Sequence, residues 1–84
     1  MKRDEILETA KELINGPRAT AYGEAFDNHE RISILWSVLL EKDISVSQEY
    51  QCMVAVKLAR LIVTPEHEDS WVDICGYAAL GGED

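Results

Sequence analysis

Residues 45–65 read SVSQEYQCMVAVKLARLIVTP, and this stretch predicts a complete helix with both of its ends. Ser45 and Gln48 have the spacing of a capping box, in which the two side chains bond the first free backbone N–H groups of a helix. Thr64 ends the helix, because a residue that precedes proline is pushed out of the α region. The apolar residues between these ends recur at helical spacing and predict one buried face: Tyr50, Met53, Val54, Leu58 and Leu61.

Two further helices are predicted on the N-terminal side of this one. The apolar stripe of the first consists of Ile6, Leu7, Ala10, Leu13 and Ile14. The stripe of the second consists of Ile32, Leu35, Trp36, Leu39 and Leu40. Gly16 and Pro17 end the first helix, since glycine favours helix C-termini and proline cannot continue the ladder of hydrogen bonds. Asp27 or Asn28 is the expected N-cap of the second helix, which ends near residue 42.

The segment between these two helices, residues 18–28, follows neither the helical nor the strand period. It is therefore predicted to be a long irregular connection. A loop of this length in a small domain is more often functional or packed on the core than idle. Arg18 and Tyr22 lie in it and could stack on a nucleotide base or bind its edge. The alternative is a loop that merely folds over the core.

A fourth helix carries apolar residues on two faces. Thr64 or Asp69 is its expected N-cap, and Gly81 with Gly82 ends it. One face consists of Trp71, Ile74, Cys75 and Ala78, and the other includes Tyr77 and Leu80. A helix of this kind is central in its bundle or lies between subunits. Gly76 in its interior indicates either the close approach of another helix or a ligand ring that lies against it.

The chain has 84 residues, which suffice for a single helical domain over 1–84. No strand-period segment is present, so the predicted fold is all-α: a four-helix antiparallel bundle with a long loop between the first two helices. A chain this short buries only about 60% of the surface that its unfolded form exposes. Cys52 and Cys75 are expected to be buried and reduced, so no disulfide reinforces the core. We therefore expect a homo-oligomer, most simply a dimer.

Charge and hydropathy exclude several kinds of partner. Sixteen acidic residues against eight basic ones give a net charge of −8, which opposes binding to the phosphate backbone of duplex nucleic acid. Free nucleotides remain candidates, because Mg²⁺ can bridge carboxylates to phosphates. No apolar run reaches the ~20 residues of a membrane span, and the charged N-terminus is not a secretion signal. The sequence predicts a cytoplasmic protein that does not enter the membrane.

Lys57 lies in the middle of the apolar face of the third helix. Its ammonium must reach the solvent, pair with a carboxylate or face a polar pocket. Arg60 lies one turn further on, and the two cations together could clamp phosphate groups. The alternative is that Lys57 reaches the edge of the helix or makes a structural ion pair.

Asp69 and Asp73 are four residues apart and project from one face of the fourth helix. Their like charges require compensation, either from Lys57 and Arg60 across the bundle or from a divalent cation such as Mg²⁺. The alternative is that Asp69 caps the helix while Asp73 makes one salt bridge. We expect Lys57 and the two aspartates to form one coupled polar site, with Tyr77 beside it.

The other aromatic and histidine side chains are expected to be structural. His29 and His67 have no further histidine at metal-ligand spacing, and His67 is placed to pair with Asp69. Most of the other large aromatic residues continue apolar stripes and are expected in the core: Phe26, Trp36, Tyr50 and Trp71.

Several short motifs resemble those of a family of small phage and prophage proteins of unknown function. They span nearly the whole chain and consist of Arg18, Tyr22-Gly23, Phe26, Leu35-Trp36, the run from Lys57 to Arg60 and the run from Glu68 to Tyr77. That family is distantly similar to the MazG-like all-α nucleotide pyrophosphohydrolases. In the MazG-like group, acidic motifs on helices hold Mg²⁺, and the metal binds the triphosphate. Here Asp69 and Asp73 supply only part of such an acidic set.

The resemblance implies a nucleotide-binding phage protein in the host cytoplasm. If the protein is an enzyme, the resemblance implies a Mg²⁺-dependent nucleotide pyrophosphohydrolase whose metal motif is incomplete. The nucleotide-binding residues would be Arg18, Tyr22, Lys57, Arg60 and Tyr77, and the metal ligands would be Asp69 and Asp73. The alternative is a non-enzymatic phage protein that sequesters a nucleotide or that binds and modulates a host protein.

Overall fold

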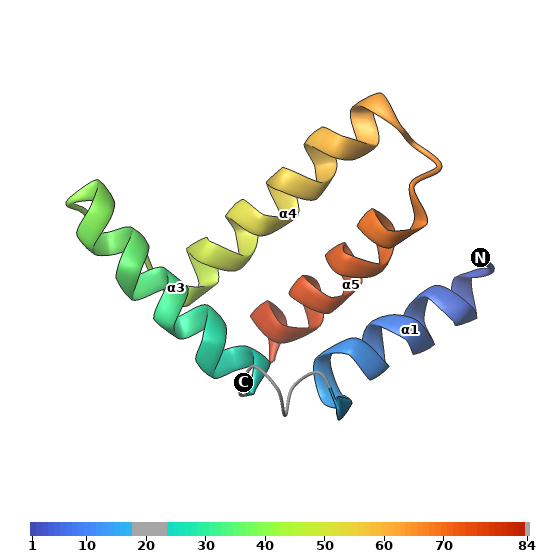
Figure 1. Ribbon diagram of the computed structural model, residues 1–84, viewed down its shortest axis with the longest axis horizontal. Coiled ribbons are helices and arrows are strands. Elements are labelled where there is room, and N and C mark those ends of the chain that lie inside the picture. The colour runs from blue at the N-terminus through green and yellow to red at the C-terminus, as the bar shows by residue number, and fades with distance from the viewer. Residues whose placement is uncertain (18–23, 84) are drawn as a thin grey trace.

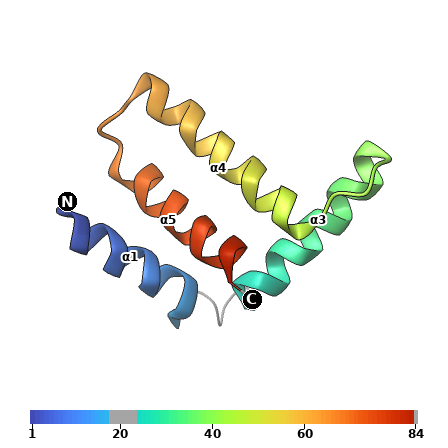
Figure 2. The same ribbon diagram turned by 180° about the vertical axis from the view of Figure 1, so that it is seen from behind.

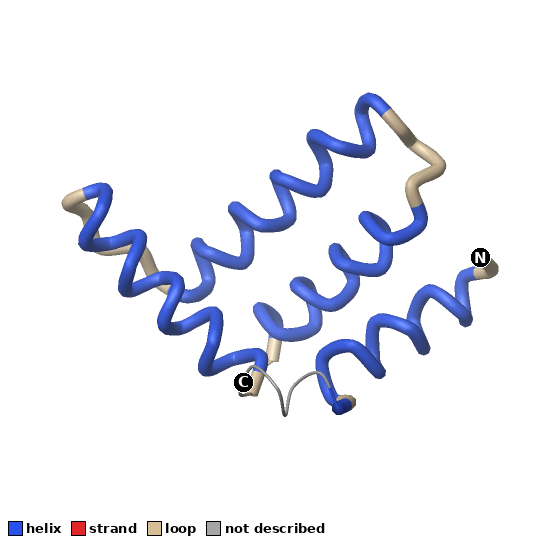
Figure 3. The backbone as a smooth tube through the Cα atoms, in the orientation of Figure 1, coloured by secondary structure: helices blue, strands red, loops and turns tan. Residues whose placement is uncertain are grey.

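The computed structural model describes residues 1–17 and 24–83. These residues form four helices and no strand, which confirms the all-α fold expected from the sequence (Figure 3). The helices are α1 (Arg3–Asn15), α3 (Ala25–Leu40), α4 (Val46–Val63) and α5 (Glu68–Gly82). None of the described helices is long and apolar enough to cross a membrane.

The ends of α4 are set by the residues that the sequence indicated. Ser45 Oγ accepts the backbone N–H of Gln48 at 3.1 Å, and the Gln48 carboxamide oxygen accepts the backbone N–H of Ser45 at 3.0 Å. The capping box is therefore complete, and two N–H groups that the helix leaves free are satisfied. At the other end, Thr64 donates its backbone N–H to Arg60, and the helix ends before Pro65.

Two helix starts differ from the prediction. α3 begins at Ala25 with Glu24 in the N-cap position, so the residues expected to cap it lie inside its first turn. α5 is capped by His67, whose Nδ1 accepts the backbone N–H of Ser70 at 3.3 Å and lies 2.8 Å from Ser70 Oγ. His67 therefore caps the helix, and the expected pairing with Asp69 is wrong. Neither Thr64 nor Asp69 is the cap.

The helix α5 lies between α1 and α4 (Figures 1 and 2). It runs antiparallel to α4 and has a helix on either side, which is the central position that the sequence suggested, although Trp71 of one apolar face is 44% exposed. A Cβ added at Gly76 would lie 3.2 Å from Ile14 Cγ2, so this buried glycine marks the close approach of α1. The alternative expectation, a ligand ring against Gly76, is wrong because Ile14 occupies that position.

The helix α3 crosses the N-terminal end of α4 and diverges from the other three helices (Figure 1). The molecule is consequently open, with a Cα radius of gyration of 13.4 Å and extents of 41 × 31 × 23 Å. Within the described residues only four apolar side chains are fully buried: Ala10, Tyr50, Leu61 and Val72. Cys52 and Trp71 are exposed and Cys75 is half-buried, so the sequence overestimated the core.

Candidate functional site

A buried carboxylate lies where the N-terminal parts of α3 and α4 meet. The Glu49 side chain is 0% exposed, and both of its oxygens lie 2.8 Å from Nδ1 of His29. An ionised carboxylate only accepts hydrogen bonds, so an imidazole N–H is the kind of donor that it requires at this position. The pair stabilises the crossing of the two helices, because an unpaired buried charge costs far more than a paired one.

Two tyrosines extend this cluster onto α5. The imidazole of His29 lies 4.7 Å from the Tyr50 ring and 5.5 Å from the Tyr77 ring, measured between ring centroids. Tyr50 is buried, and its hydroxyl has no hydrogen-bond partner among the described residues. Burial, reinforced by the charges of Glu49 and Glu83, raises the pKa of Tyr50 to about 12. The hydroxyl is therefore a neutral, unused donor inside the molecule.

A second polar contact links α4 to α5. Nζ of Lys57 lies 3.1 Å from Oδ2 of Asp73, and the two side chains are 22% and 31% exposed. The contact that the sequence predicted is therefore present, although the pair is half-buried rather than enclosed. Solvent reaches both groups, so either one can meet a ligand without unfolding of the domain.

The His29–Glu49 contact, with its two tyrosines, and the Lys57–Asp73 contact follow one another along the line where α4 packs against α5. Tyr50 and Lys57 are seven residues apart on α4, which corresponds to two turns and roughly 10 Å along the helix axis. Asp73 and Tyr77 are four residues apart on α5, which runs in the opposite direction. We call this row, formed by His29, Glu49, Tyr50, Lys57, Asp73 and Tyr77, the seam site.

The other residues predicted for the site lie outside the seam site. Arg60 and Asp69 are exposed, and no ion pair of either with a described residue is seen. Arg18 and Tyr22 fall outside the described residues. Of the seven predicted residues, the structure therefore brings Lys57 and Asp73 into contact, while Tyr77 contacts His29 and Tyr50 instead.

Asp69 and Asp73 on α5 could hold a magnesium ion only together with substrate phosphates and water. Among residues 1–17 and 24–83 no group of three or more His, Cys, Asp and Glu side chains is arranged to hold a metal. Mg²⁺, however, is commonly held by one or two carboxylates together with substrate phosphates and water. Asp69 and Asp73, one turn apart and both reached by solvent, match this form and could hold the ion with a nucleotide.

His29 and Glu49 were not singled out by the sequence, although both gave a signal. Glu49 lies three residues from Val46 and four from Met53, which places a carboxylate beside the apolar face of α4, as for Lys57. His29 lies four residues before Ser33 and seven before Trp36, on one face of α3. The partner of His29 is a carboxylate twenty residues away in the sequence, and no spacing of metal ligands points to it.

Comparison with known proteins gives relatives from bacteriophages. The chain is 42% identical over 81 residues to the Gene 55 protein of Mycobacterium phage L5 and covers 49% of that protein. It is 41% identical over 75 residues to the Gene 55 protein of Mycobacterium phage D29 and covers 50% of it. Both alignments include 89% of this chain, which spans about half the length of these curated relatives.

No solved structure matches the chain. The family described as "Domain of unknown function (DUF6378)" matches residues 5–84, which includes all four helices apart from the first two residues of α1. The similarity to MazG-like hydrolases that the motifs suggested is not part of these matches. The chain therefore belongs to the DUF6378 family, with phage Gene 55 proteins among its relatives.

Proposed function

We propose that this protein is a phage-type nucleotide-binding protein and that the nucleotide lies along the seam site. The observation that carries the proposal is the Lys57–Asp73 pair, a cation held 3.1 Å from a carboxylate where solvent reaches both. Lysine is a frequent phosphate ligand, and aspartate is a frequent ligand of the Mg²⁺ that accompanies phosphates. The pair therefore offers the two groups that a nucleotide with its metal requires.

In this proposal, residues of the seam site and four residues outside it contact different parts of the nucleotide. Lys57 exchanges its carboxylate partner for a phosphate oxygen, and Asp73 with Asp69 would hold Mg²⁺. The exposed Arg60 adds a second cation on the phosphate side. Tyr77 and Tyr50 lie next to each other, and the buried, unpartnered hydroxyl of Tyr50 would have to become accessible to bond a base or sugar. Arg18 and Tyr22 are proposed to contact the base.

Hydrolysis is a further step of the same proposal. A MazG-like pyrophosphohydrolase would cleave the bound triphosphate with Mg²⁺, which supplies charge stabilisation at the phosphates. The other form of the proposal is a protein that sequesters the nucleotide without cleaving it, since Asp69 and Asp73 supply only part of the acidic set of the MazG-like group. Release of pyrophosphate from a bound triphosphate distinguishes the two forms.

The binding proposal is tested by thermal shift with a panel of nucleoside mono-, di- and triphosphates, each with and without Mg²⁺. We expect one class of nucleotide to raise the melting temperature, because a ligand that binds only the folded state stabilises it. The shift should depend on Mg²⁺ and on the phosphate chain.

Variants connect that response to the seam site. Lys57→Met should weaken binding of the responding nucleotide by about tenfold or more, since a charge-assisted hydrogen bond contributes about 1.5–3 kcal/mol. Lys42→Met, which removes an exposed lysine in the loop after α3, is the matched control and should leave binding unchanged. A panel with no response, or equal binding by the two variants, would refute the proposal.

A further inference from the structure

The outward side of α3 is apolar and uncovered. Between Ile32 and Leu40 the helix has no charged residue. Its most exposed side chain in this stretch is Leu39, at 77% of its full accessibility. Five large apolar side chains of this helix are exposed, and we call them the α3 face: Ile34, Leu35, Val38, Leu39 and Leu40.

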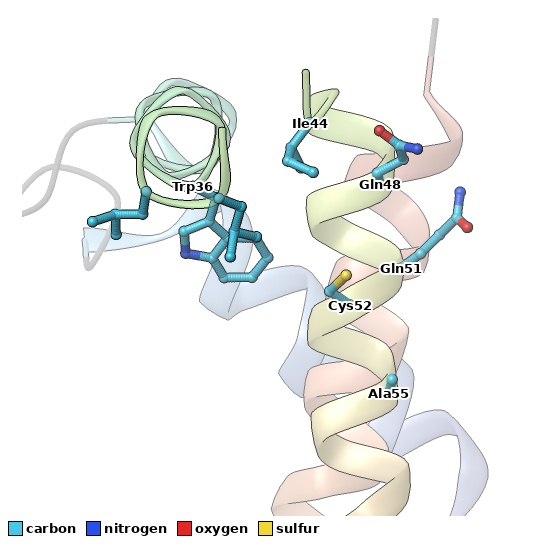
Figure 4. Close-up of a pocket in the computed structure, with 8 residues that line it drawn as sticks. Trp36, Ile44, Gln48, Gln51, Cys52 and Ala55 are labelled. Carbon is cyan, nitrogen blue, oxygen red and sulfur yellow. The ribbon is translucent and has the colours of Figure 1, made fainter. Parts of the chain in front are cut away.

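The helix α4 has a second apolar stripe, which points away from α5. Its residues recur at intervals of three and four, are all exposed and form what we call the outer α4 face: Cys52, Ala55, Val56, Ala59, Ile62 and Val63. The α3 of the same chain meets only its first part, where Trp36 and Cys52 line an open groove of about 750 Å³ (Figure 4). Beyond this groove Ile62 and Val63 are 84% and 83% exposed.

The uncovered surface is as large as a stable dimer interface. A folded monomeric protein of 9.5 kDa exposes about 5,000 Å², whereas this chain exposes 6159 Å², an excess of about 1,100 Å². A standard protein interface removes about 800 Å² from each partner. The radius of gyration, 13.4 Å against about 12 Å for a compact domain of this length, shows the same openness.

We infer that a second copy of this chain covers the surface, with the α3 face of each protomer packed on the outer α4 face of the other. A two-fold axis makes the two contacts equivalent, so one chain supplies both complementary halves. The lengths agree, since helices of 16 and 18 residues are about 24 and 27 Å long.

The absence of charge on the two faces makes contact with a second copy feasible. Each chain carries a net charge of −8, so two chains repel at long range, and this repulsion is smallest where the surfaces that meet carry no charge of their own. Neither the α3 face nor the outer α4 face contains a charged residue. The interfaces of permanent homodimers are as apolar as a protein core. The described part of this chain buries only four apolar residues, so a second copy would complete its core.

Sedimentation of the full chain at micromolar concentrations tests the inference. We expect a species of twice the 9.5 kDa mass of one chain. Leu35→Glu should raise the dimer dissociation constant by at least about tenfold, because it places charge in the apolar contact. Leu7→Glu is the matched control: Leu7 on α1 is 59% exposed and Leu35 is 60% exposed, so only the position differs. The Leu7 variant should remain dimeric.

A second measurement needs no variant and applies even if Leu35→Glu fails to fold. The melting temperature of the wild-type protein should rise with protein concentration, since dissociation accompanies unfolding of a dimer. The thiol of Cys52, exposed in the single chain, should react more slowly with a maleimide as concentration increases.

Three results would overturn the inference. They are a 9.5 kDa species with a concentration-independent melting temperature, a Leu35→Glu variant that folds and dimerises as well as the wild type, and a Cys52 thiol whose reactivity is the same at all concentrations. A chain that stays monomeric alone and gains a partner only with a host protein gives the first of these results.

Discussion

Glu49 is a fully buried acidic residue, and the fold must therefore supply it with a hydrogen-bonding partner. A carboxylate that is 0% exposed must be paired, and its partner is one imidazole that reaches both oxygens. Because His29 comes from the second turn of α3, this contact ties the helix that diverges most to the rest of the molecule. The pair is therefore expected to matter for folding, whatever the ligand.

The two histidines give a direct comparison at this scale. His29→Ala should lower the free energy of unfolding by about 3–5 kcal/mol, because it leaves the buried carboxylate unpaired. His67→Ala removes the N-cap of α5 together with the partner of the buried Ser70 hydroxyl, and should cost about 1–2 kcal/mol. Urea denaturation at neutral pH measures both values, and equal costs would contradict the buried role of Glu49.

Tyr50 gives a prediction at high pH. Its pKa is raised from 10 to about 12 in the folded protein, so between these values the unfolded chain releases the proton while the folded chain keeps it. The unfolded state then binds fewer protons, and stability must fall as pH rises from 10 to 12. In Tyr50→Phe this part of the decline should vanish, whereas Tyr77→Phe should retain it. Urea denaturation at a series of pH values compares the three proteins.

Tyr50→Phe also bears on the proposed function. A buried hydroxyl without a partner is a cost to the folded state, so its removal should leave the stability at neutral pH unchanged or raise it by about 1 kcal/mol. If the hydroxyl binds the nucleotide, the same variant binds it more weakly. If Tyr50→Phe is as stable as the wild type or more stable, and yet binds the nucleotide more weakly, the Tyr50 hydroxyl serves ligand binding and not the fold.

Single residues could be predicted from the sequence only where they broke a pattern visibly. Lys57 was found because a cation in an apolar stripe requires an explanation, and its carboxylate partner followed from that requirement. Glu49 lies at the edge of the same stripe, where an acid is ordinary on a wet helix face. Its burial depends on where α3 crosses α4, and no local pattern contains that information.

At the scale of elements, the four helices could be predicted because their period and their stop signals are local. Glycine and proline ended α1, and the residue before proline ended α4. Helix starts were less certain, since several polar residues compete to be the N-cap. At α5 the imidazole of His67 is the cap, although Asp69 is the more usual residue type and lies only two positions further on.

The contact between α4 and α5 predicts a measurable coupling. Lys57 and Asp73 are 22% and 31% exposed, so their interaction should exceed that of a surface pair, about 0.2–1 kcal/mol, and fall short of a buried one. We expect a double-mutant cycle of Lys57→Met and Asp73→Asn to give a coupling free energy of about 1–2 kcal/mol. A cycle of Lys57 with Asp69 should give almost none. Coupling below ~0.5 kcal/mol in the first cycle would show that the two residues act independently.

At the scale of the whole molecule, the sequence led us to expect a partner subunit and left two explanations open for the apolar faces of α5. Two apolar faces marked α5 as central or as part of an interface, and the structure realises the first alternative, with α1 and α4 covering it. The uncovered apolar surface is on α3 and α4 instead. The helical period of the sequence shows which faces are apolar. Which of these faces are buried within one chain depends on the angle at which α3 crosses α4, and the sequence pattern does not give that angle.

The proposed dimer makes a final prediction about salt. Two chains of net charge −8 repel at long range, and the faces proposed to meet carry no ion pairs that salt could weaken. Raising NaCl from about 0.01 to 1 M shortens the screening length from about 30 to 3 Å, so the repulsion is removed while the apolar contact remains. The dimer dissociation constant should therefore fall several-fold with added NaCl in sedimentation experiments. If salt weakens the dimer instead, charged groups hold the two chains together, and the contact lies elsewhere than on α3 and α4.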